Sequence, residues 1–338
     1  MEKEITINGA GGRIGRLVTY DLITMHDDDV NVVGLNDPMG IDAIIHSLTK
    51  NDPVHRRFKW DVKKVRDDVI SIDGVNYRVT AEKAPNSNWL GADIVVECSG
   101  FYGNDKKNPD VRLADAFFNF GAEKVLQSYD AEADLSLVMG MNHKTYDPAK
   151  HHLISNASCT TKASVMPLEI LERRGKENGF VYRKLNLLTV HAATASQNVL
   201  DVLEQASTHS TNANNAIVKL IPSLEGKVNA TSNRVPILDG SIAYLFITAS
   251  YDGDLTKDIV NGWFREAVSD RFAVFNGKEM NVNDIQGEMQ NSIVALKKTT
   301  VDQMMPGLYS ICVVAGYDNE RGSARDLALA TQYVLKKS

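Results

Sequence analysis

The feature that most constrains the fold lies at the start of the chain. A short β-branched run, Ile5-Thr6-Ile7, leads directly into the glycine-rich segment Asn8–Arg16. Apolar residues then recur at helical spacing from Ile14 to Ile23, and a second strand-like run, Asn31–Leu35, ends at Asn36-Asp37. This order of strand, glycine turn, helix, strand and acid is typical of a dinucleotide-binding unit. It predicts an α/β fold with a Rossmann domain.

The glycine loop predicts where the cofactor's pyrophosphate binds. Glycines let the backbone approach the phosphates, and the helix N-terminus adds N–H groups and a positive dipole. The last glycine comes one residue later than the usual spacing, as if the loop carries an insertion. The candidate cofactor-binding residues of this segment are Gly9, Gly11, Gly12, Arg13, Ile14 and Gly15.

Asp37 stands where a carboxylate can accept hydrogen bonds from the adenosine ribose hydroxyls. A carboxylate there repels a 2′-phosphate, so the predicted cofactor is NAD rather than NADP. The structural alternative is a turn or capping residue before Pro38.

Further apolar runs continue the α/β rhythm. Ala92–Gly100 ends in small residues, so Ser99 and Gly100 are candidate neighbours of the nicotinamide, because ligands bind outside the carboxyl ends of parallel strands. Cys98, within the same run, is interpreted as a small buried apolar residue. Lys124–Leu126 and Ser136–Gly140 are expected to be later strands of the sheet.

The most informative stretch is Leu153–Thr161, an apolar strand that runs into small polar residues and then a helical pattern. Ser158 is the expected N-cap, which puts Cys159 in the first helical turn. There the helix dipole is expected to lower the pKa of the thiol and favour a nucleophilic thiolate. Pro167 is expected to disturb an ideal helix.

His191 closes a second apolar strand, Leu187–Val190. A cysteine nucleophile needs a base that accepts its proton, and a histidine at a strand end can serve. The alternatives are an inert buried thiol and an ordinary core or surface histidine.

Composition narrows the classes of protein. With 338 residues the chain suits two domains, and a net charge of −6 without a long basic run gives no sign of nucleic-acid binding. Three cysteines do not suggest a disulfide framework, and no run is apolar enough to span a membrane. The N-terminus lacks the bases of a signal peptide, so a cytoplasmic protein is expected. No metal site is predicted.

Several motifs resemble those of the glyceraldehyde-3-phosphate dehydrogenase family. Ser155–Thr161 is similar to the family's active-site signature, and Thr189–Ala192 to the segment with its catalytic histidine. The other similar segments, in chain order, are Asn8–Arg16, Asn36–Pro38, Asp52–His55 with Phe58, Met139–His143, Arg234–Pro236 and Tyr317–Glu320.

The resemblance implies a phosphorylating aldehyde dehydrogenase. Cys159 would attack a small phosphorylated aldehyde, His191 would act as base, and inorganic phosphate would release the thioester as an acyl phosphate. Asn319 would bind the nicotinamide amide. The resemblance further implies that the substrate's phosphate is held by Thr194, Ser196 and Arg234, and that the attacking phosphate is bound near Ser158, Thr160, Thr211 and Asn212.

The resemblance also implies the domain plan: an NAD-binding domain over residues 1–158, an α+β catalytic domain with a mostly antiparallel sheet over 159–317, and a C-terminal helix that returns to the first domain over 318–338. The implied assembly is a homo-oligomer, a homotetramer in the family.

The chain departs from the family's pattern at several places. The segment Gln197–Ser210 is shorter than the family's loop and contains no arginine, and Asn212 replaces a glycine. Lys162-Ala163 replaces the usual Asn-Cys after the signature. These changes suggest a divergent member with altered substrate, phosphate use or assembly. The alternatives are a non-phosphorylating dehydrogenase of the erythrose-4-phosphate type and a non-catalytic NAD-binding paralogue.

Overall fold

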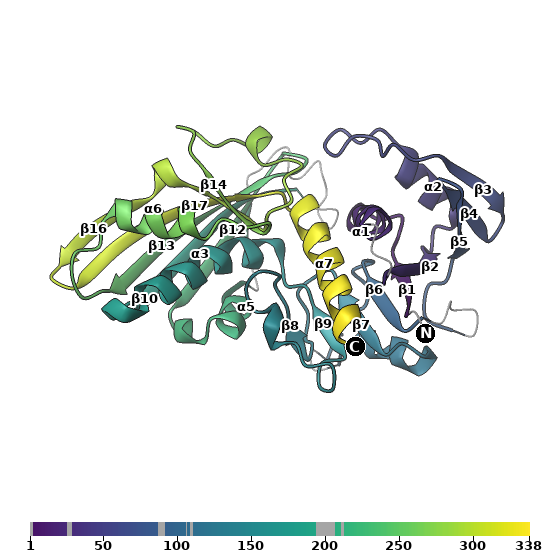
Figure 1. The fold of residues 1–338 in the computed structure, drawn as a ribbon, viewed down its shortest axis with the longest axis horizontal. Coiled ribbons are helices and arrows are strands. Elements are labelled where there is room, and N and C mark those ends of the chain that lie inside the picture. Colours follow the sequence, from purple (N-terminus) through teal and green to yellow (C-terminus); the bar gives the residue numbers. More distant parts are fainter. Residues whose placement is uncertain are drawn as a thin grey trace. The chain divides into compact units, whose positions relative to one another are not determined.

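A computed structural model describes residues 3–25, 29–86, 92–105, 107–108, 111–193, 207–210 and 213–338 (Figure 1). The chain forms two compact units. The first comprises Met1–Ala157 with Ser323–Ser338, and the second comprises Ser158–Gly322.

The first unit is an α/β structure around one large sheet. Its strands and helices are β1 (Glu4–Asn8), α1 (Arg13–Thr24), β2 (Asn31–Asn36), α2 (Ile41–Thr49), β3 (Val62–Arg66), β4 (Val69–Ile72), β5 (Val75–Thr80), β6 (Ile94–Glu97), β7 (Lys124–Gln127), β8 (Leu135–Ser136), β9 (Leu153–Ser155) and most of α7 (Arg321–Lys337). A 3-10 helix spans Leu113–Phe120.

The strand order explains how this sheet can bind a dinucleotide. In the described residues it runs β3-β4-β5-β2-β1-β6-β7-β9-β8, with parallel pairing from β5 through β8 and antiparallel pairing only at β3, β4 and β5. β1 lies in the middle, and the chain moves to one side through β2 and to the other through β6. The strand order therefore reverses at the carboxyl end of β1. Open α/β sheets bind their ligands at such a point. The predicted Rossmann domain is confirmed.

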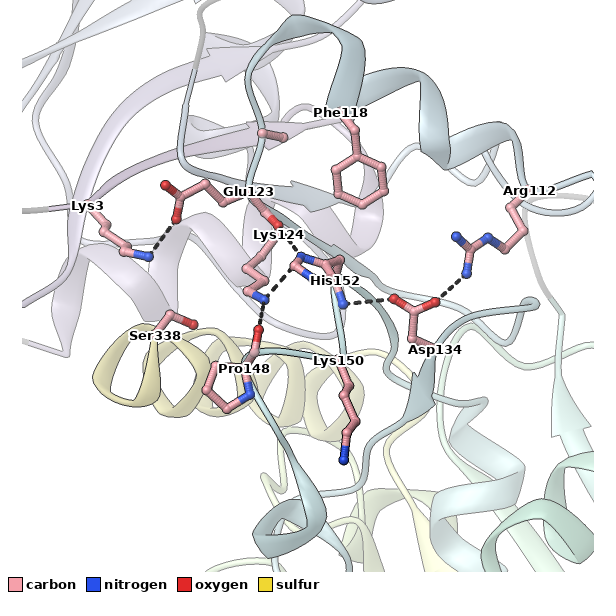
Figure 2. Close-up of a pocket in the computed structure, with 11 residues that line it drawn as sticks. Lys3, Arg112, Phe118, Glu123, Lys124, Asp134, Pro148, Lys150, His152 and Ser338 are labelled. Carbon is pink, nitrogen blue, oxygen red and sulfur yellow. Dashed lines mark hydrogen bonds and ion pairs between the residues drawn. The ribbon is translucent and has the colours of Figure 1, made fainter.

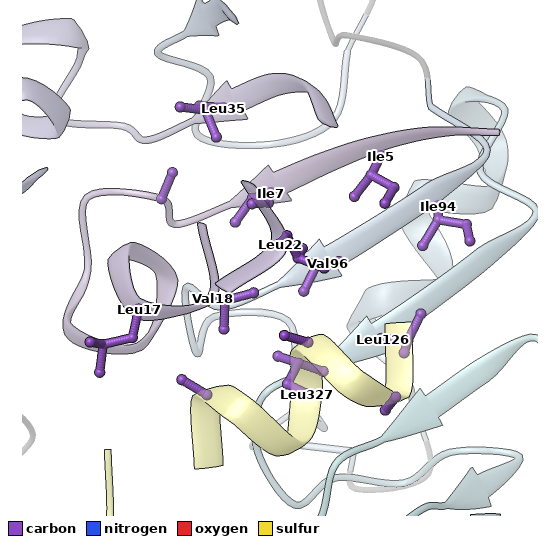
Figure 3. Close-up of a cluster of buried hydrophobic side chains, with 14 of the residues drawn as sticks. Ile5, Ile7, Leu17, Val18, Leu22, Leu35, Ile94, Val96, Leu126 and Leu327 are labelled. Atoms are coloured by element: carbon purple, nitrogen blue, oxygen red, sulfur yellow. The ribbon is translucent and has the colours of Figure 1, made fainter. Parts of the chain in front are cut away.

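The larger of two apolar clusters in the described residues of the first unit surrounds its central strands. Ile5, Ile7, Ile94 and Val96 of the central strands are fully buried, together with residues of α1 (Figure 3). Leu327, on α7, joins the same cluster. Helix α7, from the C-terminal end of the sequence, is thus part of the apolar cluster around β1 and β6. Its apolar residues repeat at helical spacing and form one packing face.

The sequence predicted a strand over Ser136–Gly140, and this prediction is wrong for every residue after Ser136. β8 contains only Leu135–Ser136, and the chain then turns, with Gly140 at a φ of 83°. The side chain of Asn142 explains the turn. It accepts from the Val138 N–H at 2.8 Å and donates to the Ser136 carbonyl at 2.8 Å, so it replaces the partners that a neighbouring strand would supply.

The second unit is an antiparallel sheet with helices. Its elements are α3 (Cys159–Gly175), β10 (Val181–Ala192), β11 (Ser207–Ser210), α5 (Ala213–Leu220), β12 (Val228–Val235), β13 (Ser241–Ser250), α6 (Lys257–Glu266), β14 (Phe272–Phe275), β15 (Ser292–Ala295), β16 (Thr300–Met305) and β17 (Leu308–Tyr317).

In the described residues, the order of this second sheet is β11-β12-β10-β13-β17-β15-β14, and β16 pairs with β17. The pairs β10/β12 and β14/β15 are parallel, and the other pairs are antiparallel. The expectation of an α+β domain with a mostly antiparallel sheet is confirmed.

Helix α3 continues through Pro167 rather than breaking there. Proline has no N–H, so the carbonyl four residues earlier, that of Ala163, loses its helical partner. The Ser292 hydroxyl, at the start of β15, donates to that carbonyl at 2.8 Å. Ser292 is fully buried, so this hydrogen bond replaces the missing one where no water can.

Across the parts of the chain that the structure describes, none of the helices combines the length and apolarity needed to cross a bilayer.

We predict that Ser292→Ala lowers the free energy of unfolding by about 1–3 kcal/mol, because it leaves the buried Ala163 carbonyl without a partner. In a Pro167→Ala background the same change should cost about 1 kcal/mol less, because the new N–H at position 167 can bond that carbonyl. Urea denaturation of the four proteins measures the coupling. Equal costs in both backgrounds would contradict the role given to Ser292.

Candidate active site

Cys159 begins helix α3, and its neighbours define the turn. The Ser158 side chain accepts from the Thr161 N–H at 3.0 Å, which confirms the predicted N-cap. Ala157, just before the cap, has a φ of 51°, a left-handed conformation that residues other than glycine adopt uncommonly. The chain therefore changes direction within one residue, and Cys159 stands in the first turn of the helix.

His191 lies near the carboxyl end of β10, and its Nε2 is 3.3 Å from the Cys159 Sγ. The other ring nitrogen, Nδ1, lies 2.7 Å from the Ala192 carbonyl oxygen, which can only accept a hydrogen bond. Nδ1 must therefore carry the proton, and Nε2 presents its lone pair to the thiol. The two residues that the sequence paired are in contact, in the geometry of a thiol and a base.

The electrostatic surroundings keep this pair neutral at rest. Burial raises the pKa of the Cys159 thiol, opposed by the charges of Lys162 and Arg234 and by hydrogen bonds from Thr160. The expectation that the helix N-terminus gives a lowered thiol pKa is therefore wrong, since desolvation outweighs the favourable influences. Burial, and next the charge of Arg234, lowers the pKa of His191 to about 4. At neutral pH the imidazole is uncharged and able to accept a proton.

Arg234 adjoins His191 because of strand register. β12 pairs in parallel with β10, and Arg234 stands directly beside His191 in that pairing. Its Nη1 donates to the Ala192 carbonyl at 3.2 Å. A partly buried guanidinium close enough to Cys159 to lower the pKa of its thiol is suited to bind an anionic group of a substrate.

Tyr317, at the end of β17, joins the same region. Its hydroxyl lies 2.9 Å from the Thr160 Oγ1 and 2.7 Å from the Thr189 Oγ1, and the side chain is buried. These bonds tie the first turn of α3 to strand β10. The sequence reasoning placed Tyr317 in the family-like motif Tyr317–Glu320 but gave it no role.

Asn319 follows β17 in the second unit. Its side-chain carbonyl accepts from the Gly240 N–H at 3.0 Å and from the Ser241 hydroxyl at 2.9 Å. These two bonds fix the orientation of the amide, which a residue that recognises another amide requires.

Of the residues expected around the two phosphates, the structure places Ser158, Thr160 and Arg234 around Cys159. Thr194, Ser196, Thr211 and Asn212 lie outside the described residues, as does most of the shortened segment Gln197–Ser210.

In the first unit, the glycine loop has the shape that a pyrophosphate needs. Gly9 has a φ of 75°, and a Cβ there would lie 2.7 Å from the Ser99 nitrogen. A Cβ on Gly15 would lie 2.0 Å from the Gly9 carbonyl oxygen, so helix α1 can approach the loop only with glycine there. The α1 N-cap, Gly12, has no side chain that could occupy the space in front of the helix N-terminus, where a phosphate group binds favourably. These residues fit NAD.

Asp37 follows β2 at the same edge of the sheet. Its carboxylate accepts from the Gly11 N–H at 2.9 Å and from the Met39 N–H at 3.0 Å. These bonds support the interpretation of Asp37 as a turn residue, and its contact with the glycine loop is compatible with the predicted role at the ribose, which stays a prediction.

Ser99 and Gly100 are held by a carboxylate that the sequence reasoning missed. Glu97, at the end of β6, accepts from the Ser99 N–H at 2.6 Å and the Gly100 N–H at 3.2 Å, and also pairs with Asn8. Asn8 in turn accepts from Asn36 at 2.7 Å. Burial raises the pKa of Glu97 to about 6 against these hydrogen bonds. A buried chain of side chains thus crosses β6, β1 and β2 at the cofactor edge.

A pocket of about 690 Å³ lies at the amino-terminal ends of the strands of this sheet, where β1, β7 and β9 begin (Figure 2). It is rich in basic residues, but these are already paired. Lys3 bonds Glu123, Arg112 bonds Asp134, Lys150 bonds Asp147, and Lys124 donates to the carbonyls of Pro148 and His151. The pocket therefore has little uncompensated charge for an anionic ligand, and we assign it no role.

A Rossmann unit and an antiparallel unit that carries a cysteine–histidine pair are the architecture of an NAD-dependent oxidoreductase, and this chain is one. The model of the glyceraldehyde 3-phosphate dehydrogenase NAD binding domain matches residues 3–105, and that of the C-terminal domain matches residues 158–319. The chain belongs to the glyceraldehyde-3-phosphate dehydrogenase family.

Curated relatives match along nearly the whole chain. A glyceraldehyde-3-phosphate dehydrogenase of Kitasatospora aureofaciens is 36% identical over 94% of this chain and 95% of its own length. Those of Streptomyces coelicolor and Chlamydia pneumoniae are each 33% identical over 99% of both chains.

The lowered pKa of His191 predicts a pH-dependent stability. The folded state disfavours the protonated imidazole. The contribution of His191 to the free energy of unfolding is therefore fully present above the ordinary pKa of 6.5, and it is lost as the pH falls toward about 4. The free energy of unfolding should fall by about 3 kcal/mol across this window from His191 alone. Urea denaturation of wild type and His191→Asn measures the difference. His46→Asn, at an exposed position of α2, should keep the wild-type slope.

Proposed function

We propose that this protein oxidises a small phosphorylated aldehyde, with glyceraldehyde 3-phosphate as the leading candidate, using NAD and inorganic phosphate through a thioester on Cys159. The observation that carries the proposal is the 3.3 Å contact between the Cys159 Sγ and an Nε2 that holds a free lone pair. Family membership supports the reaction type, and the relatives are named glyceraldehyde-3-phosphate dehydrogenases.

The reaction begins with a proton transfer. The Cys159 thiol gives its proton to His191 Nε2 as the sulfur attacks the aldehyde carbon, which forms a hemithioacetal. His191 returns that proton to the new oxyanion and is neutral again. It then accepts the hydroxyl proton of the hemithioacetal as the carbon is oxidised. When bound, NAD supplies the nicotinamide that accepts the hydride. Attack by phosphate on the resulting thioester breaks the carbon–sulfur bond and releases an acyl phosphate. The sulfur leaves as a thiolate and takes the proton held on His191, which restores the neutral pair.

Arg234 supports a phosphorylated substrate. It is half-buried, lies beside His191 in the strand pairing and influences the pKa of both reactive groups. A cation in such surroundings binds an anion more strongly than an exposed lysine or arginine does. Its charge also favours the sulfur's negative charge over a positive charge on His191, which keeps the base neutral between turnovers.

The direct test is NADH formation from glyceraldehyde 3-phosphate with and without phosphate. We expect turnover that requires phosphate, lost by at least about a thousandfold in Cys159→Ser and reduced about 10²–10⁴-fold in His191→Asn. Cys312→Ser, a half-buried thiol on β17, is the matched control and should retain activity.

Other results would support the alternatives. A rate that is independent of phosphate, with erythrose 4-phosphate preferred, would indicate a non-phosphorylating dehydrogenase. NAD binding without turnover of any aldehyde, with Cys159→Ser indistinguishable from wild type, would indicate a non-catalytic paralogue.

Asp37 is proposed to select NAD over NADP through charge repulsion of the 2′-phosphate. Asp37→Ser should raise the ratio of kcat/KM for NADP to that for NAD by about tenfold or more, which corresponds to about 1.4 kcal/mol. Asp42→Ser, at an exposed position in the first turn of α2, should leave the ratio unchanged. An unchanged ratio in Asp37→Ser would remove Asp37 from cofactor selection.

A further inference from the structure

Lys162 is a buried lysine one helical turn beyond the nucleophile. Its side chain is 1% exposed and is among the largest fully buried side chains of the described chain. Its N–H donates to the Ser158 carbonyl at 2.9 Å, so the helix is regular from its cap onward. Residues three apart on a helix are neighbours on one face, so Lys162 and Cys159 face the same interior.

Lys162 has interactions in the resting protein, and its ammonium group can also stabilise negative charge that forms nearby. Taking an ammonium group out of water is costly unless hydrogen bonds or negative charge offset the loss. The favourable position for such a group is near an atom that is or becomes negative. The Cys159 sulfur, on the same helical turn, becomes negative whenever its proton leaves.

The side chains around the Cys159 sulfur differ in the charge that they carry. His191 approaches from β10, Arg234 from β12, Tyr317 from β17 and Lys162 from α3 itself. Burial lowers the pKa of His191 to about 4, so the imidazole carries no charge at rest. Of the influences that lower the pKa of the Cys159 thiol against its burial, the charge of Lys162 comes first and that of Arg234 second. The neutral tyrosine offers hydrogen bonds only.

We propose that Lys162 is a positioning residue that stabilises negative charge on the Cys159 sulfur while the thiol proton passes to His191. The S–H bond breaks, its electron pair stays on sulfur, and the proton bonds to Nε2. Lys162 itself neither gains nor loses a proton. Arg234 is then available for the substrate, because a second cation, built into the helix, supports the nucleophile.

This assignment rests on the proposed function only in taking Cys159 as the nucleophile. The family resemblance places asparagine at this position, and an asparagine carries no charge. The contribution of Lys162 is therefore a property of this chain rather than of the signature around it.

The test is the pH dependence of iodoacetamide alkylation at Cys159, read by mass spectrometry of the peptide that contains it. The reaction needs neither substrate nor cofactor, and it follows the thiolate. In Lys162→Met and Lys162→Gln the midpoint should rise by about one pH unit or more, with the rate below the midpoint reduced about tenfold. Lys162→Arg keeps the charge and should stay within a few tenths of a unit of wild type.

The matched control is Lys184→Met, a half-buried lysine on β10, which should follow the wild-type profile. Folded Lys162→Met or Lys162→Gln protein with a wild-type profile would overturn the proposal. If neither neutral variant folds, Lys162→Arg decides: a profile like that of wild type supports the role of charge, and a midpoint raised by a full unit overturns it. Failure of the wild type to form NADH would count against the proposed function and leave this comparison intact.

Discussion

The contact between the Cys159 sulfur and the His191 ring is the interaction on which the active site depends. It requires two independent pieces of local structure. The Ser158 cap and the left-handed Ala157 set the start of α3, and the hydrogen bond to the Ala192 carbonyl sets the tautomer of the imidazole. Tyr317 connects these pieces through Thr160 and Thr189.

The charge around this pair is arranged for a reaction rather than for a permanent ion pair. Burial disfavours both the thiolate and the imidazolium, so the resting state is neutral. The positive groups nearby, Lys162 and Arg234, favour charge on sulfur and disfavour it on the ring. In the proposed reaction, this arrangement would form the thiolate through proton transfer to His191 and return the imidazole to its neutral state.

The cofactor edge depends on close backbone contact and on a buried polar chain. Gly9 and Gly15 allow the loop and helix α1 to approach β6 and each other. Glu97, Asn8 and Asn36 then connect the ends of three adjacent strands through side chains that water does not reach. Such a network is costly if one member is missing, so it holds Ser99 and Gly100 in a single arrangement.

Local patterns in the sequence predicted the class of fold, the N-cap at Ser158 and the pairing of Cys159 with His191, because periodicity, capping and motif order are local properties of the chain. The predictions from these patterns were wrong where contacts with residues distant in sequence decide the local structure or the pKa. Asn142 replaces a strand partner after Ser136, Ser292 supplies the bond that Pro167 removes, and desolvation outweighs the helix N-terminus at the thiol. The 3.3 Å contact and the burial of Lys162 were beyond these local patterns, since both depend on residues that are distant in sequence from the first turn of α3.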